Sequence, residues 1–182
     1  MDAGGFVYLA GRAKDLIIRG GHNIDPRVIE EALLGHPGVT AAAAVGMPDV
    51  HAGEVPVAYI VPADPGTFDE AGLLDWAVST IGEPAARPKR IYAIPAVPLT
   101  VVGKQFKPAL AADAARHAVA EALDRAGLGA GEITVTAGEG GLTVSVAGAD
   151  PGQVQSALAG LPLTVLAREP AMRASGEKEQ PR

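Results

Sequence analysis

A glycine-flanked lysine on an apolar loop is the feature of this chain whose type and surroundings best suit chemistry on an anion. Lys104 follows Gly103 directly, and Thr100 precedes it in the segment PLTVVGKQFK, residues 98–107. A lysine ammonium is a compact point charge on a flexible stem, and such a cation stabilises negative charge that develops in a transition state. Judged from the spacing alone, however, a solvated loop lysine is the more common case.

A second segment, GRAKDLIIRGGHNIDP at residues 11–26, combines a charged joint, a double glycine and the start of a helix. Without a Cβ, Gly20 and Gly21 let a ligand or another stretch of backbone approach closely beside His22. The alternative for these residues is a plain turn in front of a helix.

Composition argues against several other functions. The net charge is −6, and nucleic-acid binding needs a basic surface. The chain has no cysteine, and its 4 histidines lack metal-ligand spacing, so we expect no metal site. No apolar run approaches the ~20 residues of a membrane span, and no signal peptide is recognisable. We expect a soluble, cytoplasmic protein without a membrane span.

The hydrophobic pattern predicts an α+β fold. An N-terminal β-hairpin precedes a small mixed or antiparallel sheet flanked by helices, and a small α+β extension follows at the C-terminal side. The predicted strands are 6–9, 15–19, 39–46, 55–61, 90–94, 132–136, 142–146 and 163–168, and the predicted helices are 26–34, 67–81, 108–126 and 151–161. We expect a first domain at 1–110, a helix with the extension at 111–169, and a disordered tail at 170–182.

Local signals predict some of the element boundaries. Asp25 before Pro26 is typical of a capped helix start. Thr67 with Glu70 three positions later predicts a capping box for the second helix. Pro56 inside a strand pattern indicates an edge strand or a bulge, since proline has no backbone N–H to donate to a ladder.

Taken together and in this order, the two chemical segments resemble the C-terminal domain of the adenylate-forming (AMP-binding) ligase superfamily, closest to its acyl-CoA synthetase branch. Stretches between them carry the same resemblance: HPGV at 36–39, VGMPD at 45–49, GE at 53–54 and PKRI at 88–91. The resemblance covers residues 4–110 and implies a two-step reaction. A carboxylate attacks ATP to give an acyl-adenylate and pyrophosphate; the small domain then rotates, and a CoA thiol displaces AMP.

The resemblance also implies roles for individual residues. Lys104 matches the catalytic lysine that enters the active site for acyl-adenylate formation, with Gly103 and Thr100 supporting its loop. Lys14 matches the hinge whose backbone absorbs the domain rotation, and Arg12 matches an arginine close to the nucleotide.

After the rotation, the face that carries Gly20, Gly21 and His22 matches the one that lines the pantetheine tunnel of CoA. CoA is thus the implied co-substrate. ATP and Mg²⁺ are implied too, bound mainly by a large N-terminal adenylation domain that this sequence does not contain. That domain acts in cis or in trans, and we expect the chain alone to be inactive.

Several alternatives remain open at this point. The chain is either a fragment of a full ligase or a separate subunit, and we favour the fragment. A second class of function is a non-catalytic binding or regulatory module that docks on a partner ligase. The acid, the choice between CoA and a carrier-protein thiol, the oligomeric state and the role of residues 127–169 are not readable from the sequence.

Overall fold

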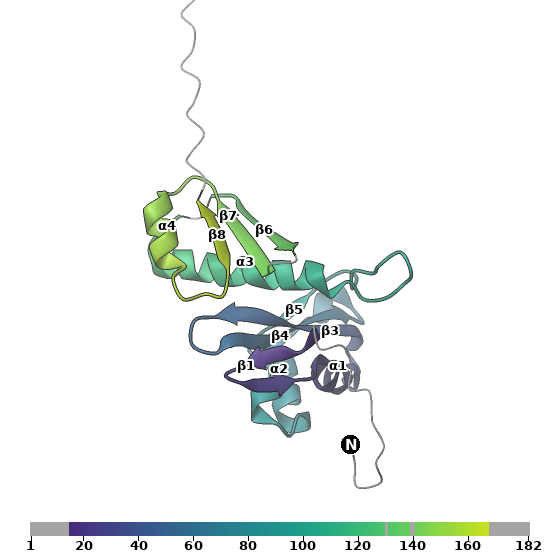
Figure 1. Cartoon of the computed structure of the whole chain (residues 1–182). Coiled ribbons are helices and arrows are strands. Elements are labelled where there is room, and N and C mark those ends of the chain that lie inside the picture. Colours follow the sequence, from purple (N-terminus) through teal and green to yellow (C-terminus); the bar gives the residue numbers. More distant parts are fainter. Residues whose placement is uncertain (1–14, 130, 139–140, 168–182) are drawn as a thin grey trace, which may run out of the picture.

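Two small sheets share one long helix in this protein (Figure 1). The computed structural model describes residues 15–129, 131–138 and 141–167. In chain order the elements are β1 Ile17–Arg19, β2 His22–Ile24, α1 Pro26–Leu34, β3 Val39–Asp49, β4 Gly53–Pro62, η2 Pro65–Thr67, α2 Glu70–Thr80, η3 Pro84–Ala86, β5 Ile91–Ala93, α3 Lys107–Arg125, β6 Ile133–Gly138, β7 Gly141–Val146, α4 Pro151–Ala157 and β8 Thr164–Ala167.

The first sheet has five strands in the order β2-β1-β4-β3, with β5 parallel to β4. Its two faces are both covered, because alternate side chains of a strand point to opposite sides. Ala58 and Ile60 of β4 pack in one core cluster with Ile29 of α1, whereas Val57 and Tyr59 belong to the cluster under α3. Helices α1 and α2 therefore lie on one face of the sheet and α3 on the other, and the predicted α+β class is confirmed.

Strand β4 lies inside the sheet, so the expectation that Pro56 marks an edge is wrong. Pro56 pairs with Gly46 of β3, and its carbonyl accepts a hydrogen bond from the Lys89 N–H at 2.8 Å on the opposite side. Strand β1 meets β4 at Gly53 and β5 meets it from Ala58 onward, both on that opposite side. The proline nitrogen faces the stretch of β4 between its pairing with β1 and its pairing with β5. No neighbouring strand of the described residues needs an N–H donor at this position, so the proline removes no hydrogen bond from the sheet.

The helix starts are partly as expected. The Asp25 side chain accepts a hydrogen bond from the Arg27 N–H, as a cap of α1 should. The predicted capping box at Thr67 is wrong, because Thr67 ends the short helix η2 and α2 starts only at Glu70. The Glu70 carboxylate instead accepts from the Ile91 N–H of β5 at 3.2 Å, a tertiary contact that outweighs the local pattern.

Helix α3 joins the first sheet to the second, which has the order β6-β7-β8. Its N-terminal half packs under the first sheet through Leu110, Ala114 and Ala118, and its C-terminal half packs against the second sheet through Val119, Ala122 and Leu123. The expected boundary after residue 110 falls inside this helix, and the division into domains remains a prediction. The strand at 6–9 and the tail from 170 lie outside the described residues.

A polar contact fixes α3 to the first sheet. The buried hydroxyl of Tyr59 donates a hydrogen bond to Asp113 Oδ2 at 2.9 Å, and Arg116 donates to Asp113 Oδ1 at 2.7 Å. The ring of His117 stacks on Tyr92 with centroids 4.4 Å apart. Burial alone raises the pKa of Asp113, but the hydrogen bonds from Arg116 and Tyr59 outweigh it and hold the pKa below its ordinary value.

We predict that Leu123→Ala lowers the free energy of unfolding by about 2–5 kcal/mol, because a fully buried side chain of α3 leaves a cavity under the second sheet. Urea unfolding followed by circular dichroism measures the loss. Leu34→Ala, the same change at a side chain that is 47% exposed on α1, should cost about 1 kcal/mol or less. Equal losses in the two variants would contradict the packing described for α3.

The lowered pKa of Asp113 predicts a dependence of stability on pH. Its ionised form is favoured by folding, so its contribution is complete above the ordinary Asp pKa and is lost as the pH falls through the lowered value. The difference in unfolding free energy between the natural chain and Asp113→Asn should therefore shrink from about pH 6 to about pH 2. Asp75→Asn, at an exposed position of α2, is the matched control. A constant difference for Asp113→Asn over this range would exclude the proposed linkage.

Candidate functional site

The loop that carries Lys104 is a short, hydrogen-bonded hairpin between β5 and α3. Leu99 and Gln105 form an antiparallel bridge at its stem. The Thr100 N–H donates to the Lys104 carbonyl at 2.7 Å, and the Thr100 hydroxyl oxygen accepts from the Lys104 N–H at 3.1 Å. Gly103 closes the turn with φ +77°, a left-handed conformation that favours glycine. The backbone of Lys104 is thus held by Thr100, and its side chain is exposed.

An ion pair anchors the base of this loop where it enters α3. Lys107 Nζ lies 2.7 Å from Glu30 Oε1 of α1, and the two side chains are only 17% and 12% exposed. The same carboxylate oxygen accepts a hydrogen bond from the Ala44 N–H of β3 at 2.9 Å. Gln105 Nε2 adds a hydrogen bond to the Ala42 carbonyl of β3 at 3.1 Å. The loop therefore projects from a fixed base.

An open cavity of about 520 Å³ lies beside the loop, and Asp15, Asp25, Arg27, Lys104 and Lys107 contribute to its lining. Arg27 pairs with Asp25 at 2.8 Å and lowers the pKa of that carboxyl, while Lys107 pairs with Glu30. Lys104 forms no ion pair with a carboxylate of the described ranges. Its charge is therefore available to an anion brought to this cavity.

Gly20 and Gly21 form the turn of a hairpin between β1 and β2. Their φ angles are +55° and +86°, which the two-residue turn requires. The Gly20 N–H donates to the Ala52 carbonyl at 2.8 Å, so the turn is fixed to the β3–β4 connection. His22 Nδ1 lies 3.9 Å from Glu83 Oε1, and both side chains are largely exposed.

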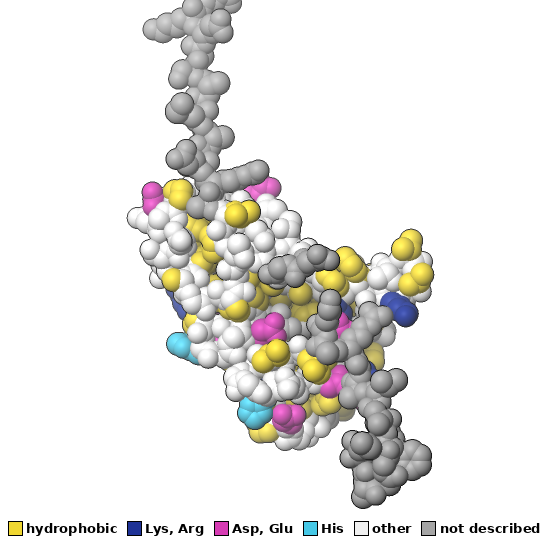
Figure 2. Space-filling model, viewed as in Figure 1, with side chains coloured by type: hydrophobic (Ala, Val, Ile, Leu, Met, Phe, Trp, Pro, Cys, Tyr) yellow, Lys and Arg dark blue, Asp and Glu magenta, His cyan; other side chains and the backbone are white. Residues whose placement is uncertain are grey.

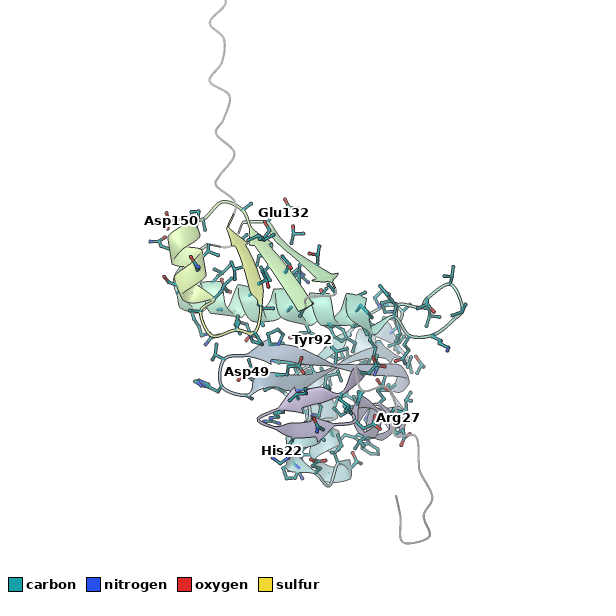
Figure 3. All side chains as sticks on the ribbon, viewed as in Figure 1. His22, Arg27, Asp49, Tyr92, Glu132 and Asp150 are labelled. Carbon is teal, nitrogen blue, oxygen red and sulfur yellow. The ribbon has the colours of Figure 1, made fainter. Side chains whose placement is uncertain are left out.

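The structure thus gathers the predicted site residues of the described ranges into two separate groups. One is the loop between β5 and α3 that carries Lys104, which projects at the right of Figure 1. The other is the β1–β2 glycine turn beside His22, which is labelled at the lower left of Figure 3. The positions predicted as hinge and nucleotide contact, Lys14 and Arg12, lie outside the described residues. Asp15, which directly follows Lys14, lines the cavity beside Lys104.

Sequence reasoning missed the residues that hold these groups in place. The sequence signals no role for Glu30 or Lys107, yet their ion pair anchors the base of the Lys104 loop. Glu54 was given no role, yet its Oε2 accepts a hydrogen bond from the Ile18 N–H at 2.9 Å and so ties β1 to β4. Both contacts, Lys107 with Glu30 and Glu54 with Ile18, join distant parts of the chain, and no local pattern signals them.

Within the described ranges, no cluster of three or more His, Cys, Asp and Glu side chains is arranged to hold a metal ion. The helices described here also include none with the length and apolar character needed to cross a lipid bilayer.

Comparison with known proteins identifies a region that ends at Lys104 and begins after the glycine turn. Residues 28–104 match the protein family described as "AMP-binding enzyme C-terminal domain". Marinolic acid–CoA ligase of Pseudoalteromonas sp. (strain SANK 73390) is 51% identical over 106 residues, which are 58% of this chain and 16% of the ligase. Sulfoacetate–CoA ligase of Cupriavidus necator is 47% identical over 103 residues, which are 57% of this chain and 20% of the ligase.

A solved structure gives the same result for the fold. The crystal structure of ATP-bound MatB from Rhodopseudomonas palustris superposes with a TM-score of 0.57 at 31% identity, over 63% of this chain and 23% of MatB. The chain thus spans about a fifth of the length of the relatives it matches.

We predict that Glu30→Gln lowers the free energy of unfolding by about 1–3 kcal/mol, because Lys107 then stays largely buried without a charged partner. Urea unfolding followed by the fluorescence of Trp76, the single tryptophan, measures this change. The control is Glu31→Gln at the exposed neighbouring position, which should change stability by less than about 0.5 kcal/mol. If both variants behave alike, Glu30 does not anchor the loop.

Proposed function

We propose, because residues 28–104 belong to the AMP-binding enzyme C-terminal domain family, that this chain acts as the mobile C-terminal part of an ATP-dependent acid–CoA ligase. The observation that carries the proposal is the placement of Lys104. Its side chain is exposed, it has no carboxylate partner within the described residues, and its loop has a fixed base.

In the first half-reaction, Lys104 acts at the reacting carboxylate and the α-phosphate of ATP. A carboxylate oxygen forms a bond to the α-phosphorus, the bond from this phosphorus to the bridging oxygen breaks, and pyrophosphate leaves. Negative charge gathers on the oxygens around that phosphorus as the bonds exchange. A lysine ammonium placed there stabilises the transition state electrostatically. Thr100 and Gly103 contribute by holding the backbone of Lys104 in the turn.

In the second half-reaction, the glycine turn faces the reacting centre. The CoA thiol adds to the acyl carbon, the bond from this carbon to the phosphate oxygen breaks, and AMP leaves. Gly20 and Gly21 expose backbone without side chains, which suits close passage of the pantetheine arm beside His22. Because this turn and the Lys104 loop are separate segments, between β1 and β2 and between β5 and α3, a rotation of the chain between the two steps brings each of them to the reacting centre in turn. Lys14 serves as the hinge in this proposal, and Arg12 lies close to the nucleotide.

The proposed partner is the large adenylation domain of such a ligase, in cis or in trans. This sequence matches about a fifth of the length of its relatives, and its described residues include no cluster of three or more His, Cys, Asp and Glu side chains arranged to hold a metal ion. We therefore propose that ATP and magnesium are held mainly by the large domain, and that the isolated chain forms no acyl-CoA. The acid stays open, since the matched relatives are named for acids as different as marinolic acid and sulfoacetate.

The test uses an enzyme in which the whole chain replaces the matching C-terminal segment of the sulfoacetate–CoA ligase of Cupriavidus necator. We predict that Lys104→Ala lowers acyl-adenylate formation by about 100-fold or more, because the transition state loses its cation. Pyrophosphate release with ATP and sulfoacetate measures this step. Formation of the thioester from preformed acyl-adenylate and CoA should be largely spared.

The matched control is Lys89→Ala, which removes another exposed lysine that pairs with Asp49 and should leave adenylation unchanged. Equal loss of both half-reactions in Lys104→Ala would contradict the proposed role, and an unaffected enzyme would favour a non-catalytic docking module. Acyl-CoA formation by the isolated chain would show that no large domain is needed.

A further inference from the structure

Exposed apolar side chains gather at the tip of the loop that carries Lys104. Val101 is fully exposed, and Val102 is 78% exposed. Leu99 and Phe106 at the stem are also exposed. Figure 2 shows this loop projecting from the body of the protein, with hydrophobic side chains at its end beside a cationic one.

The two valines cannot fold back onto the protein without breaking the turn. The Gly103 N–H donates to the Thr100 carbonyl at 2.8 Å, and this bond encloses Val101 and Val102. The left-handed conformation of Gly103 and the bridge between Leu99 and Gln105 fix the direction of the turn. Valine is also stiff at χ1, so little side-chain freedom is lost when it is buried by another surface.

This cluster differs from the other exposed hydrophobic side chains in the described ranges. No two of those are adjacent in the sequence, and scattered exposed hydrophobic side chains are normal for a protein surface. They are Ile18, Val28, Leu34, Val50, Phe68, Val78 and Leu166. Only at the Lys104 loop do adjacent large apolar residues stand on a projecting turn.

We propose that Val101 and Val102 form an apolar anchor that packs against apolar side chains of the large adenylation domain beside its reacting centre and thereby positions Lys104. The inference rests on the proposed function, because a loop that brings Lys104 to the reacting carboxylate has to carry the two preceding side chains into the same cleft. Lys104 follows Val102 by two positions, so the contact is continuous with the site.

The anchor also biases the conformation of the ligase. The valines are buried only when the loop is in the cleft, so their burial favours the adenylation arrangement over the one for thioester formation. Two small side chains bury little area, which keeps the contact reversible and lets the chain leave for the second step.

The test replaces both residues in the fused enzyme by threonine, which keeps the branched shape and introduces a hydroxyl. Val101→Thr with Val102→Thr should lower the rate constant of adenylation by about tenfold while the thioester step from preformed acyl-adenylate is spared. Val101→Ile with Val102→Ile should keep the adenylation rate near that of the parent. The control Val78→Thr, at a side chain that is 49% exposed on α2, should change neither step.

The outcomes separate this inference from the proposed function. If Lys104→Ala abolishes adenylation and the double threonine variant does not change it, the anchor is wrong and the catalytic lysine stands. If Lys104→Ala has no effect, the proposed function itself fails. Analytical ultracentrifugation of the chain alone tests whether the loop instead binds a second copy of the chain. If the chain self-associates, and if the double threonine variant abolishes this self-association while adenylation stays unchanged, the proposed anchor is wrong.

Discussion

The ion pair between Lys107 and Glu30 is the interaction on which the presentation of the candidate catalytic lysine depends. It joins the first turn of α3 to α1, and the shared carboxylate also holds an N–H of β3. A charged pair with so little exposure is costly to break, because the remaining partner stays buried alone. The ion pair therefore fixes the orientation of the loop before α3, and Lys104 projects from the surface without contributing to the core.

A rigid base and an exposed tip suit a domain that works in two positions. In the proposed function, the Lys104 loop serves adenylation and the separate β1–β2 turn serves thioester formation, so a rigid rotation of the domain would exchange one group for the other at the reacting centre. Tyr59 and Asp113 fix α3 to this sheet, and α3 in turn carries the second sheet. The C-terminal extension is thus attached to the first sheet through a shared helix.

Elements with strong local signals were predictable from the sequence. The cap at Asp25, the apolar runs of β3 and β4 and the long alanine-rich α3 all needed only neighbouring residues. Strand β2 was missed because it has three residues and depends on pairing with β1, where Ile24 faces Ile17. The prediction of an edge strand at Pro56 was wrong because β4 accommodates a proline in the interval between its pairing with β1 and its pairing with β5, and the sequence does not show where these pairings occur. The loop of Lys104 could be located from its glycine and its lysine, whereas the contacts of Glu30, Lys107 and Glu54 require the folded chain.

The measurement that tests the account most directly is the reactivity of the Lys104 amine in the fused enzyme, read by mass spectrometry after brief labelling with an amine-specific reagent. Lys89 serves as the internal reference, since it should react alike in every state. The account predicts that Lys104 is protected when ATP and the acid are bound and becomes reactive again with AMP and CoA. Equal labelling of Lys104 in both states would contradict the claim that this loop enters the cleft for one step and leaves it for the other.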